Sequence, residues 1–136
     1  DPAKRTYCIG HSLGGAAATV AALRLAGSSS GFLDLRLITF GRPNVMLKSK
    51  KSSDHFENIS VVAGSDIVAT VPKLCFGPDE GQNIIYLGNN GKDYLNPNKE
   101  FRNDDRKMDE LISDHMMDTS YTPRIKKCKL EKLICD

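Results

Sequence analysis

The chain has 136 residues, 40% of them hydrophobic and 26% charged, which suits one globular domain of ordinary size. Its formal net charge of +2 is too small to indicate a nucleic-acid partner or an anionic membrane surface. No apolar run approaches the roughly 20 residues that a transmembrane helix needs. The first residues show neither a methionine nor a signal-peptide pattern, so a secreted and a cytoplasmic location both stay open.

The first half of the chain alternates between apolar runs typical of strands and a segment typical of a helix. Residues 5–10 predict a strand that ends in glycine, and residues 13–27 predict a helix rich in alanine and leucine that Gly27 would cap. The next predicted elements are a strand at 35–41, a short exposed helix at 45–53 and a third strand within 57–66. Strands separated by helical segments imply a parallel sheet.

The second half begins with a different pattern. Residues 83–95 contain two β-rich runs on either side of Asn-Asn-Gly, which predicts an antiparallel hairpin. Residues 96–106 are polar and loop-like, and residues 108–136 have helical propensity interrupted near Pro123. We therefore expect a single α/β domain whose sheet is mostly parallel with an antiparallel edge.

The four cysteines do not define a disulfide framework. They allow three fully paired connectivities, and their spacing does not choose among them. Cys8 lies in an apolar strand and is expected to be a buried thiol, whereas Cys128 and Cys135 would share a face if their segment were helical. We expect no metal site, because no Cys/His spacing resembles a zinc site, and no cofactor.

One hydroxyl stands in a glycine-rich turn between the first predicted strand and the first predicted helix. Residues 10–14 read Gly-His-Ser-Leu-Gly, which fits the nucleophile-elbow pattern Gly-x-Ser-x-Gly in its required strand–turn–helix context. Gly10 and Gly14 would keep the turn tight, His11 would complete it, and Ser12 would be the nucleophile. The backbone N–H of Leu13 would be one donor of an oxyanion hole.

A nucleophilic serine needs a base, and three histidines are available. His11 adjoins the serine, where neighbouring side chains diverge in a sharp turn. His55 precedes the third strand and leaves little room for an acid before it. Because this arrangement of strand, elbow and helix carries its triad in the order serine, acid, histidine, His115 suits the role of base.

The acid should follow the carboxyl end of a parallel strand, where catalytic loops collect. Asp66 does so, whereas Asp34 and Asp54 precede strands and would lie at the opposite edge. Asp79 is a weaker alternative, and Asp114 adjoins His115 and cannot easily face its ring.

Four segments together resemble the class 3 lipases of fungi, plants and protozoa. They are the elbow GHSLGGA, the strand end TFGRPNV, the acid loop VAGSDIVATVP and the Asp-His segment SDHMMDTSY. The resemblance covers nearly the whole chain and implies an α/β-hydrolase fold with helices on both faces of the sheet. It implies Ser12 as nucleophile, Asp66 as acid, His115 as base and Leu13 as oxyanion donor.

The sequence also differs from the family pattern at several points. Asn44 stands where the family often has arginine, and Ile67 where it often has proline. The family has a comparable stretch before the elbow, with further strands, a lid helix and a second oxyanion residue. Residues 1–136 therefore look like the C-terminal portion of one lipase domain. The N-terminal half of the same domain would be the partner of this chain.

The implied function is hydrolysis of lipid carboxylic esters, with the lipid at a water interface as substrate. Apolar residues near the active edge could hold an acyl chain or simply pack the core, namely Val68, Val71 and Leu74. A phospholipase or another carboxylesterase of the same family is an alternative. So is a lipase-like binding scaffold without turnover, or an acyl transferase, since malonyl transacylases also carry Gly-His-Ser-Leu-Gly.

Overall fold

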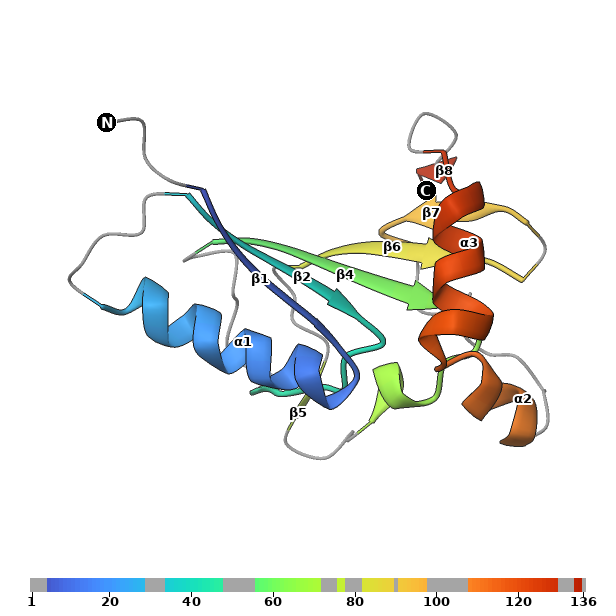
Figure 1. Cartoon of the computed structure of the whole chain (residues 1–136), viewed down its shortest axis with the longest axis horizontal. Helices are drawn as coiled ribbons and strands as arrows, with labels where there is room; N and C mark the ends of the chain where they lie inside the picture. Colours follow the sequence, from blue (N-terminus) through green and yellow to red (C-terminus); the bar gives the residue numbers. More distant parts are fainter. Residues whose placement is uncertain are drawn as a thin grey trace.

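The computed structural model describes residues 5–28, 34–47, 56–71, 76–77, 82–89, 91–97, 108–129 and 134–135. Its centre is a six-stranded sheet in the order β1-β2-β4-β6-β7-β8 (Figure 1). The first four of these strands run parallel, and they are β1 Thr6–His11, β2 Leu35–Phe40, β4 Glu57–Ala63 and β6 Asn83–Leu87. The predicted α/β fold with a mostly parallel sheet is therefore confirmed.

The helix α1, Leu13–Ala26, follows β1 after one intervening residue and covers one face of the sheet. Its bounds agree with the prediction, and Gly27 forms its C-cap. Ala22 packs with Leu35 and Leu37 of β2 in an apolar cluster. Small residues on the helix allow this close approach, and Figure 1 shows α1 running beside β1 and β2.

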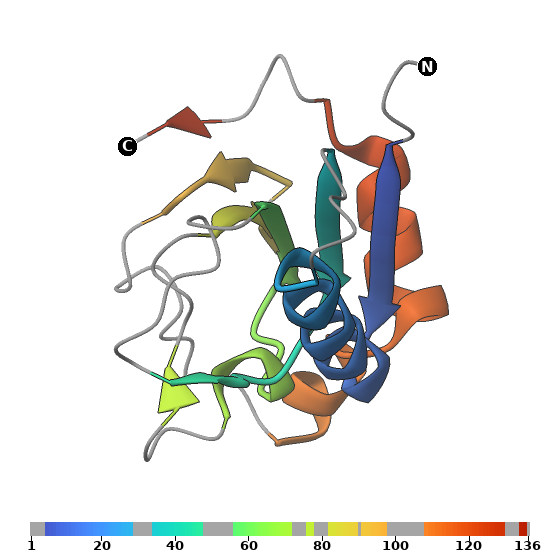
Figure 2. The same ribbon diagram turned by 90° about the vertical axis from the view of Figure 1, so that its left-hand side faces the viewer.

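The opposite face of the sheet is covered by the C-terminal helical segment. Phe40 and Val61 have the opposite side-chain direction to Leu37, because successive side chains in a strand alternate between faces. They pack with Met117 and Tyr121, which belong to the π-helix η3, Met117–Tyr121. Figure 2 shows α1 and the orange C-terminal helices beside different parts of the sheet. Helices therefore lie on both faces.

The helical prediction for the last third of the chain is correct in type but not in detail. Helix α2 spans Met108–Ser113, and η3 runs directly into α3, Thr122–Lys127. The interruption lies at residues 114–116 instead of near Pro123, which occupies the first turn of α3. Proline is tolerated there because the first helical N–H groups have no partner within the helix.

Two short strands correct other predictions. The helix expected at 45–53 is wrong at its start, where β3, Met46–Leu47, pairs antiparallel with β5, Phe76–Gly77. The rest of that predicted helix lies outside the described residues. Strand β8, Ile134–Cys135, replaces the helix expected there, so Cys135 does not share a helix face with Cys128. Cys8 and Cys128 are both free thiols, and Cys8 is half-buried instead of fully buried.

The predicted hairpin is present. Strand β7, Asp93–Leu95, pairs antiparallel with β6, and Gly91 in the connection has a φ of 73°. β8 then pairs with β7 and forms the outermost strand on that side.

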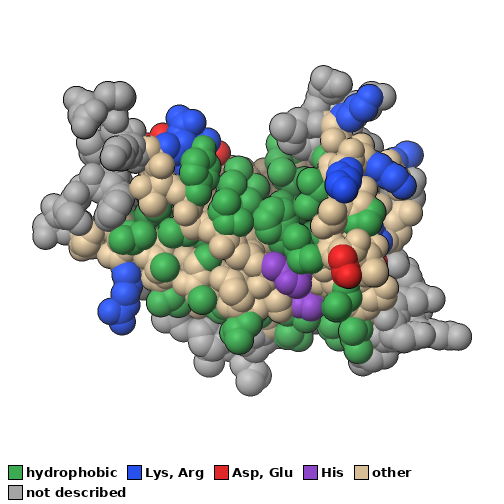
Figure 3. Space-filling view, in the orientation of Figure 1, with side chains coloured by type: hydrophobic (Ala, Val, Ile, Leu, Met, Phe, Trp, Pro, Cys, Tyr) green, Lys and Arg blue, Asp and Glu red, His purple; other side chains and the backbone are tan. Residues whose placement is uncertain are grey.

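Strand β1 is the other edge of the sheet. In the described part of the chain it pairs with β2 alone, and its outward side chains Tyr7 and Ile9 are 48% and 60% exposed. Figure 3 shows hydrophobic side chains gathered over the middle of the side of the molecule that Figure 1 views. No described helix is long and apolar enough to cross a membrane.

Candidate active site

The carboxyl ends of β1, β2 and β4 meet at one edge of the sheet because the three strands are parallel and adjacent. Ser12 follows β1, Gly41 follows β2, and Asp66 lies shortly after β4. His115 reaches the same edge from the break between α2 and η3. Four distant parts of the chain thus supply one cluster of side chains.

Ser12 occupies a strained turn. Its φ of 55° is in the left-handed region, which is unfavourable for a residue with a side chain and costs about 1–3 kcal/mol. Its backbone N–H donates to the carbonyl of Phe40 in the next strand, which holds the turn on the sheet. The Ser12 carbonyl accepts from the N–H groups of Gly15 and Ala16 as α1 begins.

The glycines around Ser12 differ in how tightly they are packed. A Cβ added at Gly10 would lie 2.3 Å from the carbonyl oxygen of Gly14, so only glycine fits at position 10. A Cβ at Gly14 would meet no described heavy atom within 4 Å, so of the two glycines predicted to keep the turn tight only Gly10 is required by its neighbours. The second close approach involves Gly15, whose added Cβ would lie 3.1 Å from Cβ of Arg42.

The structure brings Ser12, His115 and Asp66 together. The Oγ of Ser12 lies 2.7 Å from Nε2 of His115, and Nδ1 of His115 lies 3.0 Å from each carboxylate oxygen of Asp66. The Asp66 side chain is fully buried, and that of His115 is 14% exposed. This chain of contacts can pass a proton from the hydroxyl to the imidazole while the carboxylate orients the ring.

Asp66 has further donors that fix its carboxylate. The hydroxyl of Tyr121 donates to Oδ2 at 2.6 Å, and the N–H of Val68 donates to Oδ1 at 2.9 Å. Burial, and then the neighbouring Asp66 carboxylate, raise the pKa of Tyr121 far above its usual range, so the phenol keeps its proton. Tyr121 lies at the end of the Asp-His segment, but its sequence position alone does not indicate this contact.

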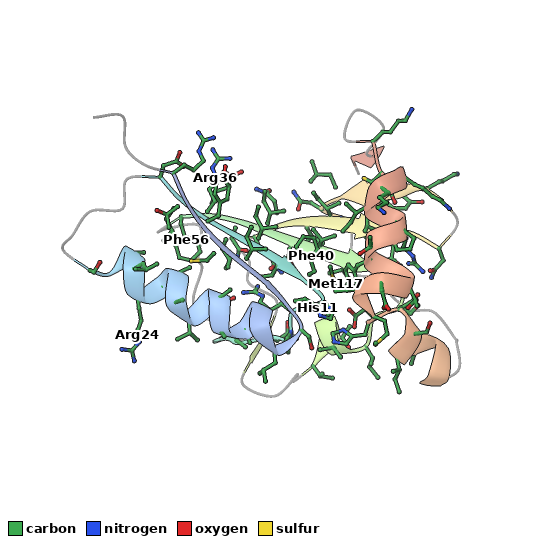
Figure 4. The ribbon with its side chains drawn as sticks, in the orientation of Figure 1. His11, Arg24, Arg36, Phe40, Phe56 and Met117 are labelled. Carbon is green, nitrogen blue, oxygen red and sulfur yellow. The ribbon has the colours of Figure 1, made fainter. Side chains whose placement is uncertain are left out.

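His115 is contacted by His11 of the elbow, and Gly41 leaves room beside its ring. The ring of His11 stacks on that of His115 with centroids 4.7 Å apart, and its Nε2 lies 2.7 Å from the His115 carbonyl oxygen. Figure 4 shows His11 at the end of β1, beside the segment that carries Met117. Gly41 has a φ of 54°, and a Cβ there would lie 2.4 Å from Asp66 and 3.1 Å from Nδ1 of His115. A glycine after β2 therefore leaves space for the acid–base contact.

The other candidates are not at this cluster. Asp34 pairs with Arg5 and Arg36 beside the first residues of β1 and β2, at the opposite edge of the sheet. His55, Asp54 and Asp79 lie outside the described residues. Asp114 accepts a hydrogen bond from the backbone N–H of Ser65, a contact that the sequence does not reveal. Within the described ranges no group of His, Cys, Asp and Glu could hold a metal ion.

Comparison with known proteins agrees with this architecture. The family described as Lipase (class 3) matches residues 2–76, more than half of the chain, a range that includes Ser12 and Asp66 and ends before His115. The chain is similar to a solved structure titled "Rhizomucor miehei lipase propeptide complex, native", with a TM-score of 0.55 and 26% identity. That match covers 68% of this chain and 31% of the Rhizomucor chain. No curated protein sequence matches. Since the family match extends over more than half of a chain that also shares its fold with a solved lipase, the chain belongs to the class 3 lipase family.

Proposed function

We propose that this chain carries the catalytic triad of a serine hydrolase that cleaves carboxylic esters of lipids. The observation that carries the proposal is the continuous contact from Ser12 Oγ through His115 to Asp66 at the carboxyl edge of the sheet. Membership of the class 3 lipase family supports the same chemistry. The match covers only 31% of the Rhizomucor lipase chain. Ester hydrolysis by a whole protein that contains this chain is therefore also a proposal.

In the proposed mechanism, Ser12 Oγ attacks the ester carbonyl carbon while Nε2 of His115 takes its proton. The alcohol leaves with that proton, and an acyl group remains on Ser12. Water then attacks the acyl carbon, His115 takes a proton from the water, and the carboxylic acid leaves as the proton returns to Ser12. Asp66 holds the imidazole with Nδ1–H toward its carboxylate and stabilises the imidazolium that forms.

The oxyanion that forms on the carbonyl needs hydrogen-bond donors. The N–H of Leu13 is in the first turn of α1, where helix N–H groups have no acceptor within the helix. It also lies at the positive end of the helix dipole, which favours a developing negative charge. A second donor in this fold comes from a loop earlier in the chain than the elbow.

Apolar side chains near the triad favour a lipid substrate. Several large hydrophobic residues are exposed next to the triad segments, namely Leu13, Val71, Ile112 and Met116. Leu13 and Met116 directly follow Ser12 and His115, so both flank the reacting atoms in sequence. Figure 3 shows hydrophobic side chains bordering the histidines. Val68 is partly buried, and Leu74 lies outside the described residues.

A fluorophosphonate probe tests the proposal, because it reacts covalently only with an activated serine. In a longer protein that contains this chain, we expect the probe to label Ser12, as found by mass spectrometry of the modified peptide. The His115→Ala variant should react far more slowly because the serine then has no base. A folded protein that binds lipid but takes no label on Ser12 would instead support the binding scaffold, and labelled protein that forms esters faster than acids would support acyl transfer.

We further propose that residues 1–136 form the C-terminal portion of a single α/β-hydrolase domain. Among the described strands β1 pairs with β2 alone, and its side chains Tyr7 and Ile9 are exposed, which is what such a division of the domain would leave uncovered. Unpaired edge strands with apolar side chains tend to associate. The N-terminal half of the same domain would pair with β1 and supply the second oxyanion donor.

Assayed alone, the 136-residue chain is therefore expected to associate and to hydrolyse esters slowly. Loss of one oxyanion donor lowers kcat by about 10²–10³. The measurement is ester turnover by this chain beside a longer protein that contains it, with the mass of each sample determined by light scattering. A monomeric chain with the turnover of the longer protein would show that the proposed division of the domain is wrong.

A further inference from the structure

Asp114 is a buried carboxylate that the proposed mechanism does not use. It directly precedes His115 in the break between α2 and η3, and it is 5% exposed. A charged group at this depth is unfavourable unless it is paired and hydrogen-bonded. Its partners therefore indicate why a carboxylate occupies this position.

Those partners join the two segments that carry the acid and the base. Oδ2 of Asp114 accepts a hydrogen bond of 2.8 Å from the backbone N–H of Ser65, the residue before Asp66. His115 contacts Asp66 at 3.0 Å. Two neighbouring residues on one segment thus contact two neighbouring residues on the other.

Arg124 of α3 completes this arrangement from a third element. Its Nη2 donates to Oδ1 of Asp114 at 2.7 Å, and its Nη1 donates to the carbonyl oxygen of Leu87 at 3.1 Å. The same Leu87 carbonyl accepts from the N–H of Gly64 at 2.9 Å. The guanidinium therefore ties the carboxylate to the end of β6, beside the start of the acid loop.

The backbone at Gly64 packs closely against Asp114 and Arg124. Gly64 has a φ of 50°, and a Cβ added there would collide with Asp114 Oδ2 and lie 2.6 Å from Nη1 of Arg124. The backbone at the start of the acid loop therefore lies in close contact with the Asp114 carboxylate and the Arg124 guanidinium. A shift of Asp114 must move Ser65, and Asp66 follows it in the chain.

We propose that Asp114, held by Arg124, is a positioning residue that sets the spacing between Asp66 and His115. This inference rests on the proposed triad and adds a residue to it. Asp114 does not touch substrate or the reacting atoms. It acts by fixing the acid loop and the base segment relative to each other, so that His115 lies within hydrogen-bond distance of both Asp66 and Ser12.

Two variants of the longer protein test this. Asp114→Asn removes the charge that pairs with Arg124. The guanidinium needs the amide oxygen as its acceptor, so the amide NH2 group faces the N–H of Ser65, and two donors then oppose each other. Asp114→Glu keeps the charge and the acceptor but lengthens the connection by one methylene, so no buried charge is left unpaired. Since a misplacement of about 1 Å can lower the rate on the order of 10²-fold, both variants should lower kcat by roughly that factor with KM little changed. Asp118→Asn is the matched control, because Asp118 is exposed and close in sequence.

Two measurements separate positioning from general stability. The low-field proton NMR signal of His115 Nδ1–H reports its contact with Asp66 directly, and we expect folded Asp114→Asn and Asp114→Glu to lose or shift it. In an Asp66→Asn background, Asp114→Asn should add little further loss of kcat, because residues that act through the same contact are not additive.

The proposal is wrong if both variants keep the parent kcat and the parent NMR signal, or if their losses add fully to that of Asp66→Asn. Equal losses in Asp118→Asn would show that the effect does not depend on the contacts of Asp114 and would also overturn the proposal. Failure of the proposed function is a different result, because a protein without ester turnover would still show whether the NMR signal depends on Asp114.

Discussion

Replacing Ser12 by alanine is expected to lower kcat for ester hydrolysis on the order of 10⁶-fold and to leave the fold intact. Only the hydroxyl group is lost, and it forms a hydrogen bond with Nε2 of His115, so the packing around residue 12 changes little. Alanine also suits the residues around it, because α1 continues with small side chains. Initial rates on a short-chain ester, with circular dichroism to verify folding, measure the effect.

Ser113→Ala is the control for this variant. Ser113 is an exposed serine at the end of α2, two residues before His115, and its removal should leave kcat near the parent value. A Ser12→Ala protein that hydrolyses the ester at near the parent rate would mean that another group is the nucleophile. The probe-labelled peptide would then identify that group.

Replacing Asp66 by asparagine is expected to lower kcat by about 10⁴. The amide group can donate to Nδ1 of His115, and this favours the tautomer with the proton on Nε2, where it faces Ser12 and cannot accept its proton. Val68 N–H and Tyr121 O–H now donate to different carboxylate oxygens, so the single amide oxygen keeps only one of these bonds. If it keeps Val68 N–H, the Tyr121 hydroxyl accepts from the amide N–H instead, and the folded state should persist.

The rate of Asp66→Asn is compared with that of Asp118→Asn, which makes the same chemical change at an exposed position. The control should keep the parent kcat. If Asp66→Asn kept it as well, Asp66 would not be the acid that orients His115, and Asp79 or another carboxylate would have to take that role.

The fold could be predicted where local pattern and tertiary structure agree. The apolar run of β2 and the alanine-rich α1 are buried in one cluster, so composition and packing favour the same element. The short strands β3 and β8 could not be predicted, because two residues carry no periodicity and their strand character comes from the pairing partner. The sequence predicts a break near Pro123 because proline in mid-helix is unfavourable, whereas Pro123 lies in the first turn of α3, where it is tolerated.

The candidate site could be predicted in its order but not in its supporting contacts. Ser12, Asp66 and His115 follow from an elbow motif and from the rule that parallel strands bring their carboxyl ends to one edge. Their catalytic roles stay predictions until the variants are measured. The contacts of Tyr121 and Asp114 depend on how a π-helix and a tight loop pack together, and no spacing in the sequence encodes that packing.

The distance along the chain between Ser12 and His115 has a consequence for synthesis of the protein. The two residues are 103 positions apart, so the nucleophile is translated early and its base late. At about 5–20 residues per second, roughly 5–20 s separate their appearance on the ribosome. The contact also depends on β1, β2 and β4 lying side by side, because these strands place Ser12 and Asp66 at one edge of the sheet. Any chemistry that needs both residues is therefore absent from a nascent chain that ends before His115, and a covalent serine probe would report only molecules in which the two segments have come together.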